Sequence, residues 1–155
     1  MIVFIDSGIL GILANPNKEG EVSECEEWLY GLLSKGIYVL TSELCDYEIR
    51  RSLVLEAKKN PQINGIKNLD ELRGIITFLP ITSTLLKEAS VLWAEARIQG
   101  VPTADAKSLD VDIIICTQCI LLTEEFPGRS IIIATTNIKH LSRFASARNW
   151  RNIKV

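Results

Sequence analysis

The sequence predicts an α/β fold built on a mainly parallel sheet of four to five strands. Short apolar runs of strand length recur along the chain, and segments with helical periodicity separate them. This alternation is typical of parallel strands joined by helical crossovers. The 155 residues fit a single domain, residues 1–155, which would bury about 70% of its extended surface. The predicted strands are Ile2–Ile5, Ile37–Leu40, Phe78–Ile81 and Ile131–Ala134.

Three helices are expected between the first and third strands. Leucines at helical spacing follow Trp28, behind acidic residues that favour a helix amino terminus, and Gly36 ends this helix. A second helix covers about residues 42–59 and is broken by Pro61. A shorter one covers roughly Leu69 to Ile76.

The second half of the chain predicts two long helices separated by a loop. Thr82 or Ser83 caps the first of them, and residues 100–109 form the loop. Asp110 can cap the apolar helix over residues 111–123. The remaining predicted elements are a short helix at Ile138 to Phe144 and an edge strand at Ile153 to Val155.

The composition indicates a compact soluble protein with no membrane partner. Hydrophobic residues make up 47% of the chain and the mean hydropathy is +0.19. The longest apolar stretch, Ile113 to Leu122, is too short to span a bilayer. The amino terminus enters a strand without a basic flank, which predicts a cytoplasmic protein. The four cysteines are expected to be free thiols, and the pair Cys116 and Cys119 lies inside an apolar helical run.

The charge is distributed unevenly along the chain. The net charge is −2, which argues against holding nucleic acid by bulk electrostatics. Residues 126–155, however, carry six basic residues and no acid, a pattern that suits a phosphate-bearing partner. A solvated surface that balances an acidic body is the structural alternative. The basic residues are Arg129, Lys139, Arg143, Arg148, Arg151 and Lys154.

Acidic residues stand where an α/β sheet binds ligands. Asp6 ends the first strand and Asn137 follows the fourth, so ordinary right-handed crossovers can bring the two together. Glu48 lies two turns into its helix, and Asp112 stands at a helix start. Gathered carboxylates repel one another, and a hard cation such as Mg²⁺ would relieve that repulsion. The sequence therefore favours metal-assisted activation of water.

These residues form motifs that resemble the PIN-domain family, especially its small single-domain members of the VapC toxin type. The motifs are Asp6, then Tyr47-Glu48-Ile49-Arg50-Arg51, then Leu109-Asp110-Val111-Asp112, then Thr135-Thr136-Asn137-Ile138-Lys139-His140. The resemblance covers nearly the whole chain in order and spacing. It implies a three-layer α/β/α sandwich that presents acids to Mg²⁺ or Mn²⁺ and hydrolyses single-stranded RNA.

The resemblance also implies roles for individual residues. Asp6, Glu48 and Asp112 would hold metal, and Asn137 would occupy the fourth position, where similar toxins have Asp or Asn. Asp110, Ser7 and Thr135 would be auxiliary residues beside the acids. A cognate antitoxin and a homodimer are the further partners that the resemblance leaves open. Arginines that would guide the RNA backbone are Arg50, Arg51, Arg143, Arg148 and Arg151.

Several assignments have structural alternatives. Asp6 is also a suitable helix cap, and Glu48 could pair with Arg50 or Arg51 on the helix surface while Glu43 or Asp46 serves as the ligand. Asp110 is expected to cap while Asp112 ligates. For the remaining polar residues, the alternatives are a structural role for His140 and a loop position for Asp105.

Two other functions remain open from the sequence. One is a PIN-like module that binds RNA or protein without cutting. The other is an aspartate-based phosphatase with Asp6 as nucleophile, although Gly8 stands where such enzymes carry a second aspartate.

Overall fold

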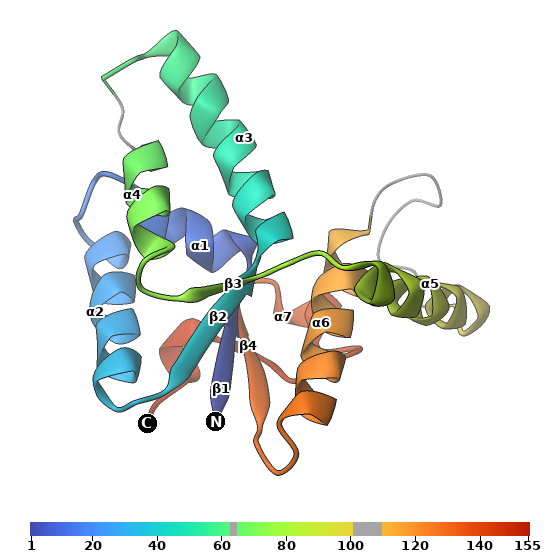
Figure 1. Ribbon diagram of the computed structural model, residues 1–155. Helices are drawn as coiled ribbons and strands as arrows, with labels where there is room; N and C mark the ends of the chain where they lie inside the picture. The colour runs from blue at the N-terminus through green and yellow to red at the C-terminus, as the bar shows by residue number, and fades with distance from the viewer. Residues whose placement is uncertain (63–64, 101–109) are drawn as a thin grey trace.

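The computed structural model describes residues 1–62, 65–100 and 110–155, and within them five strands form one parallel sheet in the order β3-β2-β1-β4-β5 (Figure 1). All four strand pairings are parallel, which confirms the predicted α/β class. The strands are β1 (Ile2–Ile5), β2 (Tyr38–Ser42), β3 (Thr77–Leu79), β4 (Ile131–Thr135) and β5 (Ala147–Asn149).

Helices cover both faces of the sheet, so that the molecule has the predicted three layers (Figure 1). Helices α1 (Ser7–Ala14), α2 (Glu21–Ser34) and α4 (Gly65–Leu72) lie on the left of the sheet in Figure 1. Helices α5 (Ser83–Ile98) and α6 (Val111–Glu125) lie on the right. The remaining helices are α3 (Glu43–Lys59), which projects from the end of β2, α7 (Ile138–Leu141) and the 3-10 turn η1 (Trp150–Asn152).

The central strands are apolar throughout because both of their faces are buried. Strand β1 lies between β2 and β4, and every residue from Ile2 to Ile5 is inaccessible to solvent. All five residues of β4 are buried as well. Parallel strands covered by helices on both faces show such continuous apolar runs. This explains why the sequence located these two strands well.

The edge elements differ from their predicted positions. Helix α4 covers 65–72 rather than 69–76, since the chain leaves the helix at Leu72 and turns into β3. Helix α7 ends at Leu141, before Phe144. The predicted edge strand at Ile153 to Val155 is wrong: Ala147–Asn149 pairs with β4 instead. The apolar side chain of Ile153 is buried, although it is not in a strand. Its carbonyl accepts a hydrogen bond from the indole of Trp28 on α2 at 3.0 Å.

Helices α1, α3 and α6 begin at the carboxyl edge of the sheet, and each has a side-chain cap. Asp6 accepts a hydrogen bond from the Ile9 amide at 3.0 Å, Ser42 from Leu44 at 3.1 Å, and Asp110 from Ile113 at 3.1 Å. These caps start α1, α3 and α6, and the Asp110 cap confirms the prediction. Because helix amino termini carry partial positive charge, this edge favours anions.

The predictions for the cysteines and for helix α5 also agree with the structure. Thr82 caps α5 by accepting from the Leu85 amide at 3.1 Å. All four cysteines are buried free thiols, and burial raises the pKa of Cys116 to about 12. Within the described residues, no helix is both long and apolar enough to cross a membrane. Asp105 and the predicted loop beyond residue 100 lie outside the described residues.

Candidate active site

Asp6 is fixed at the carboxyl end of β1 by hydrogen bonds to two elements. Its side chain caps α1, and its other carboxylate oxygen accepts a hydrogen bond from the Thr135 hydroxyl at the end of β4. Its own amide donates to the Ala134 carbonyl at 3.2 Å. The side chain is only 7% exposed. Asp6 therefore caps a helix, which is the alternative role that the sequence allows for it. At the same time its carboxylate contacts the end of the neighbouring strand β4.

Asn137 is linked to Asp6 through Thr135. The Asn137 amide donates a hydrogen bond to the Thr135 hydroxyl oxygen at 2.8 Å, and that hydroxyl donates to Asp6. The side chain of Asn137 is exposed and does not cap α7. The adjacent strands β1 and β4 thus bring Asp6, Thr135 and Asn137 to one place, as the crossover rule predicts.

Glu48 reaches the same place from α3. Its carboxylate accepts a hydrogen bond from the hydroxyl of Ser7, the residue that follows Asp6. Arg50 does not pair with Glu48: its guanidinium binds Asp46 and Asp70 instead. Of the acids on α3, Glu48 is the one that the structure brings beside Asp6.

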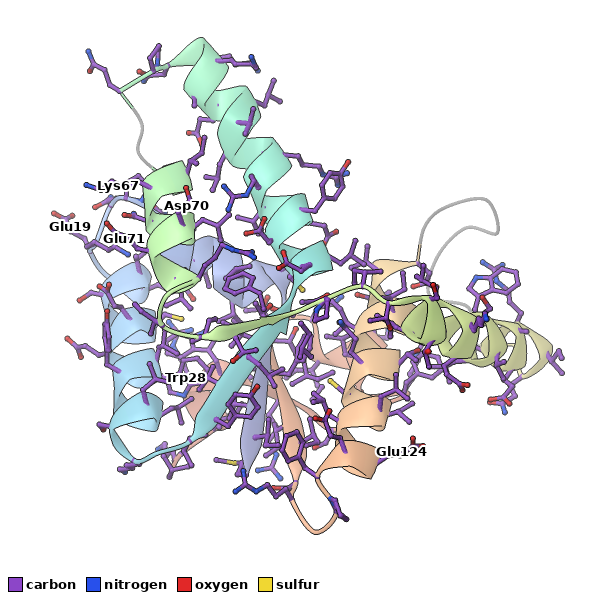
Figure 2. All side chains as sticks on the ribbon, viewed as in Figure 1. Glu19, Trp28, Lys67, Asp70, Glu71 and Glu124 are labelled. Carbon is purple, nitrogen blue, oxygen red and sulfur yellow. The ribbon has the colours of Figure 1, made fainter. Side chains whose placement is uncertain are left out.

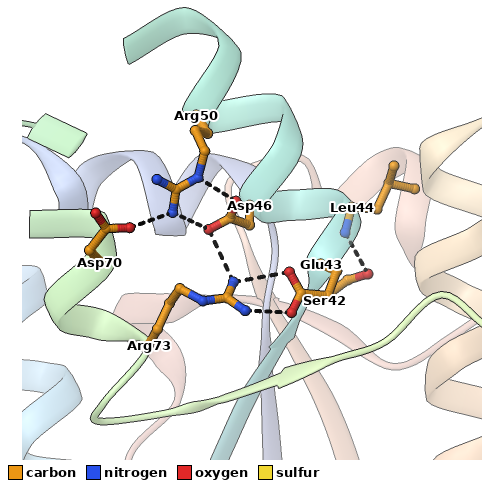
Figure 3. Close-up of polar contacts among 7 residues, drawn as sticks. All are labelled: Ser42, Glu43, Leu44, Asp46, Arg50, Asp70 and Arg73. Atoms are coloured by element: carbon orange, nitrogen blue, oxygen red, sulfur yellow. Dashed lines mark hydrogen bonds and ion pairs between the residues drawn. The ribbon is translucent and has the colours of Figure 1, made fainter. Parts of the chain in front are cut away.

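Glu43 and Asp46, two other acids of α3, belong to a network of ion pairs, which we call the arginine network (Figure 3). Arg73 binds Glu43 at 3.0 Å and Asp46 at 3.3 Å. Arg50 makes two hydrogen bonds to Asp46, at 2.8 and 3.0 Å, and one to Asp70 at 2.7 Å. Figure 2 labels Asp70 on the side of α4 that faces α3. Since Glu43 and Asp46 are neutralised here, the structure favours Glu48 over either of them as a metal ligand.

Asp112 lies in the first turn of α6, two residues after the cap Asp110. Burial raises the pKa of Asp112, and the negative charges of Asp110 and Glu48 raise it further, while His140 opposes them. Asp110 is only 8% exposed and acts as the cap that the sequence predicted. The influence of Glu48 on Asp112 shows that the acids of α3 and α6 lie within electrostatic reach of one another.

Asp6 belongs to the same electrostatic group. Burial raises the pKa of its carboxyl, hydrogen bonds from Thr135 and Ile9 partly oppose this, and the charge of Asp112 raises the pKa again. We call Asp6, Glu48 and Asp112 the acid cluster. Within the described residues, none of its members forms an ion pair with Lys or Arg. The cluster therefore carries negative charge that a bound cation would compensate.

The donors of the acid cluster fit a hard divalent cation in chemical type. Carboxylate oxygens are the preferred ligands of Mg²⁺, and Thr135 and Ser7 already orient two of the carboxylates by hydrogen bonds. In the part of the chain that the structure describes, no three acid, histidine or cysteine side chains are clustered as a finished ligand group. The Glu48 carboxylate is instead held by the Ser7 hydroxyl.

The arginines predicted to contact RNA differ in the partners that they already have. Arg50 is engaged in the arginine network, whereas Arg51 lies over the Tyr47 ring at 5.6 Å. Arg151 pairs with Glu21 and Glu24 of α2, both at 3.1 Å. Arg143 and Arg148 are exposed.

His140 is the residue near the site whose position the sequence did not predict. His140 lies in α7, the short helix that follows β4, and its effect on the Asp112 carboxyl is to lower the pKa. The expected structural role of His140 does not include this electrostatic contact. The sequence does contain a signal for this position: His140 stands three residues after Asn137 in the same motif.

Comparison with known proteins identifies the fold. No protein-family model matches the chain, and no match to a curated protein was found. Solved structures do match: VapBC2 from Rickettsia felis, bound to a DNA fragment from its promoter, is 20% identical with a TM-score of 0.71. This match covers 97% of the present chain and 99% of the other. VapBC-1 from nontypeable Haemophilus influenzae is 16% identical with a TM-score of 0.63, covering 98% and 100%.

The architecture and these likenesses define a PIN-type fold, as the sequence motifs predicted. More particularly, the chain shares its fold with these two VapBC structures over nearly its whole length.

Proposed function

We propose that this protein is a divalent-metal-dependent endoribonuclease that cuts single-stranded RNA, and that it is the toxin of a toxin–antitoxin pair. The observation that carries the proposal is the acid cluster. Asp6 directly follows β1, and Glu48 and Asp112 lie in α3 and α6. The hydroxyl of Ser7, the residue after Asp6, holds Glu48, and Asp112 raises the pKa of Asp6 as Glu48 raises that of Asp112. Within the described residues none of the three is paired with Lys or Arg. The proposed cofactor is Mg²⁺ or Mn²⁺.

In this proposal the protein residues bind, orient and balance charge. Asp6, Glu48 and Asp112 would hold the metal, which when bound lowers the pKa of a water and stabilises negative charge on phosphate. Thr135 and Ser7 keep the carboxylates of Asp6 and Glu48 in place by hydrogen bonds. The amino termini of α1, α3 and α6 add partial positive charge at the edge where phosphate would lie.

A toxin role is supported by the resemblance of the sequence motifs to VapC-type toxins, together with the likeness of the fold to two VapBC structures. We therefore propose a cognate antitoxin protein as a partner. A homodimer is a further partner consistent with this class.

A catalytically silent PIN-like module that binds RNA or protein is the second candidate. It is favoured by Asn137, which places a neutral amide in the fourth position, and by the lack of a finished ligand group among the described residues. Metal-independent RNA binding without cleavage would distinguish this module from the nuclease.

The decisive test compares two glutamates on the same helix. Wild-type protein incubated with structured and single-stranded RNAs should cleave only with Mn²⁺ or Mg²⁺. Glu48→Gln should lower cleavage at least about 100-fold, since loss of even an outer-shell partner of a metal ligand costs about 10- to 100-fold. Glu43→Gln, in the arginine network, is the matched control and should stay active. Loss of activity in Glu43→Gln with full activity in Glu48→Gln would overturn the assignment.

A further inference from the structure

The face of α3 that carries Glu48 also carries an exposed aromatic ring and an exposed guanidinium. Leu44, Tyr47, Glu48 and Arg51 follow one another at positions i, i+3, i+4 and i+7, the spacing of a single helix face. Leu44 packs against the apolar cluster that α5 and α6 form, which includes Ile113. This contact turns the face toward α6, where Asp112 precedes Ile113.

Tyr47 and Arg51 form a stacked pair on this face. The Arg51 guanidinium lies 5.6 Å from the centre of the Tyr47 ring, and Tyr47 is 57% exposed. The adjacent residue Glu48 is oriented into the acid cluster by Ser7. An exposed ring and a cation therefore stand beside a proposed metal ligand on the same helix.

Arg51 also differs from its neighbour Arg50. The Arg50 guanidinium is held by Asp46 and Asp70 (Figure 3). Within the described residues, Arg51 has no ion pair. The pair of Tyr47 and Arg51 thus presents flat surfaces and a positive charge to solvent, at the rim of a negatively charged site.

We infer that Tyr47 and Arg51 form a stacking platform for one unpaired base of single-stranded RNA, next to the phosphate at the acid cluster. Bases of single strands stack on aromatic rings and on arginine planes, and they do so with little dependence on sequence. The positive charge of Arg51 would also attract the strand to a site that otherwise repels it. This inference rests on the proposed function, because it takes RNA as the ligand.

The same helix supplies a matched control. Leu55 is eight residues beyond Tyr47 on a similar face and is also 57% exposed. It lies about 12 Å farther along the helix axis, away from the sheet (Figure 1). A protein docking on this face would cover both residues, whereas a base beside the acid cluster would contact only Tyr47.

The test measures binding of short labelled single-stranded RNA by full-length protein in a metal chelator, so that no strand is cut. Tyr47→Ala should weaken binding about 10-fold, in the range that loss of one base–aromatic contact produces. Tyr47→Phe should bind like wild type because it keeps the ring, and Leu55→Ala should also bind like wild type. For RNA that carries an abasic nucleotide at the stacked position, wild type and Tyr47→Ala should bind equally.

Each other outcome overturns the inference. Unchanged RNA binding by Tyr47→Ala would remove the platform. Equal loss of RNA binding in Tyr47→Ala and Leu55→Ala would also overturn it, because the effect would not be specific to the position beside the acid cluster. A Tyr47 effect that persists on every abasic RNA would exclude stacking. The proposed function is judged separately: wild type that binds RNA through Tyr47 but does not cut it with Mn²⁺ would refute the nuclease and leave the platform standing. Wild type that binds no single-stranded RNA would overturn the platform.

Discussion

Helix α3 carries acids on two faces, and the two faces differ in what neutralises them. On one face Glu43 and Asp46 lie in the arginine network; on the other Glu48 accepts a hydrogen bond from Ser7. Burial would raise the pKa of Asp46, but Arg50 and Arg73 outweigh it and lower that pKa. For Asp112 in the acid cluster, burial and neighbouring acids both raise the pKa. The same kind of side chain therefore stabilises the fold in one region and carries uncompensated charge in the other.

The largest expected difference between the acid cluster and the arginine network is in how their variants respond to added metal. Mn²⁺ that binds only the folded protein stabilises it by about 2.7 kcal/mol at a hundred times its dissociation constant. We expect this gain in wild type and in Asp46→Asn, and its loss in Asp6→Asn and Asp112→Asn. Without metal, the last two should be at least as stable as wild type because they relieve repulsion. Differential scanning calorimetry with and without Mn²⁺ measures all four.

Asn137→Asp is the complementary variant. A fourth carboxylate should lower the metal-free melting temperature and tighten Mn²⁺ binding, because it adds one negative charge beside Asp6. A wild-type protein indifferent to millimolar Mn²⁺, with mutants that behave identically, would contradict the nuclease proposal and favour the binding-only module.

The arginine network should matter for stability rather than for metal. Arg50→Ala removes two hydrogen bonds from the buried Asp46 and one from Asp70, so it should destabilise the fold by about 1–3 kcal/mol. Arg151→Ala is the matched control and should destabilise the fold less, because its ion pairs with Glu21 and Glu24 are exposed and weakened by solvent. Urea titration gives both values. Equal losses of stability in the two variants would mean that the burial of Asp46 does not make the arginine network more stabilising than an exposed ion pair.

The pH dependence of stability should have opposite signs in the two regions. The lowered pKa of Asp46 gives stability that is present above its unfolded value, about 3.9, and is lost as pH falls through the folded value. The raised pKa values of Asp6 and Asp112 give stability that is present below about 3.9 and is lost as pH rises through the folded values.

Melting temperatures of the metal-free protein against pH test this sign. As the pH rises from about 4, the melting temperature of Asp112→Asn should increase relative to that of wild type. As the pH falls below that point, the melting temperature of Asp46→Asn should drop less than that of wild type. Parallel curves for all three proteins would contradict the contrast between the regions.

Features that depend on local chemistry and on the geometry of the sheet could be predicted from the sequence. Asp6 and Asn137 could be placed together because continuous apolar runs mark buried parallel strands whose ends share one edge. Asp110 could be identified as a cap from its position before an apolar helix. Such predictions require only the local sequence around each residue and the rule that crossovers between parallel strands are right-handed.

The arginine network could not be predicted in this way. Its partners come from α3, α4 and the segment after α4, and the sequence placed α4 four residues too late. Whether Glu43, Asp46 or Glu48 faces the site depends on these long-range pairs, which local spacing does not specify. The partners of Arg151 on α2 were missed for the same reason, because they lie more than a hundred residues away in the sequence.

The smallest expected effect concerns the basic carboxyl-terminal residues, where paired and unpaired arginines can again be compared. Each phosphate contact on a single strand contributes about 0.7 to the slope of log affinity against log salt. Arg143→Ala or Arg148→Ala should each lower that slope by about this amount if the exposed guanidinium contacts RNA. Arg151→Ala should change it less, because Glu21 and Glu24 already neutralise that side chain. Binding isotherms at several salt concentrations would refute this ranking if Arg151 alone carried the slope.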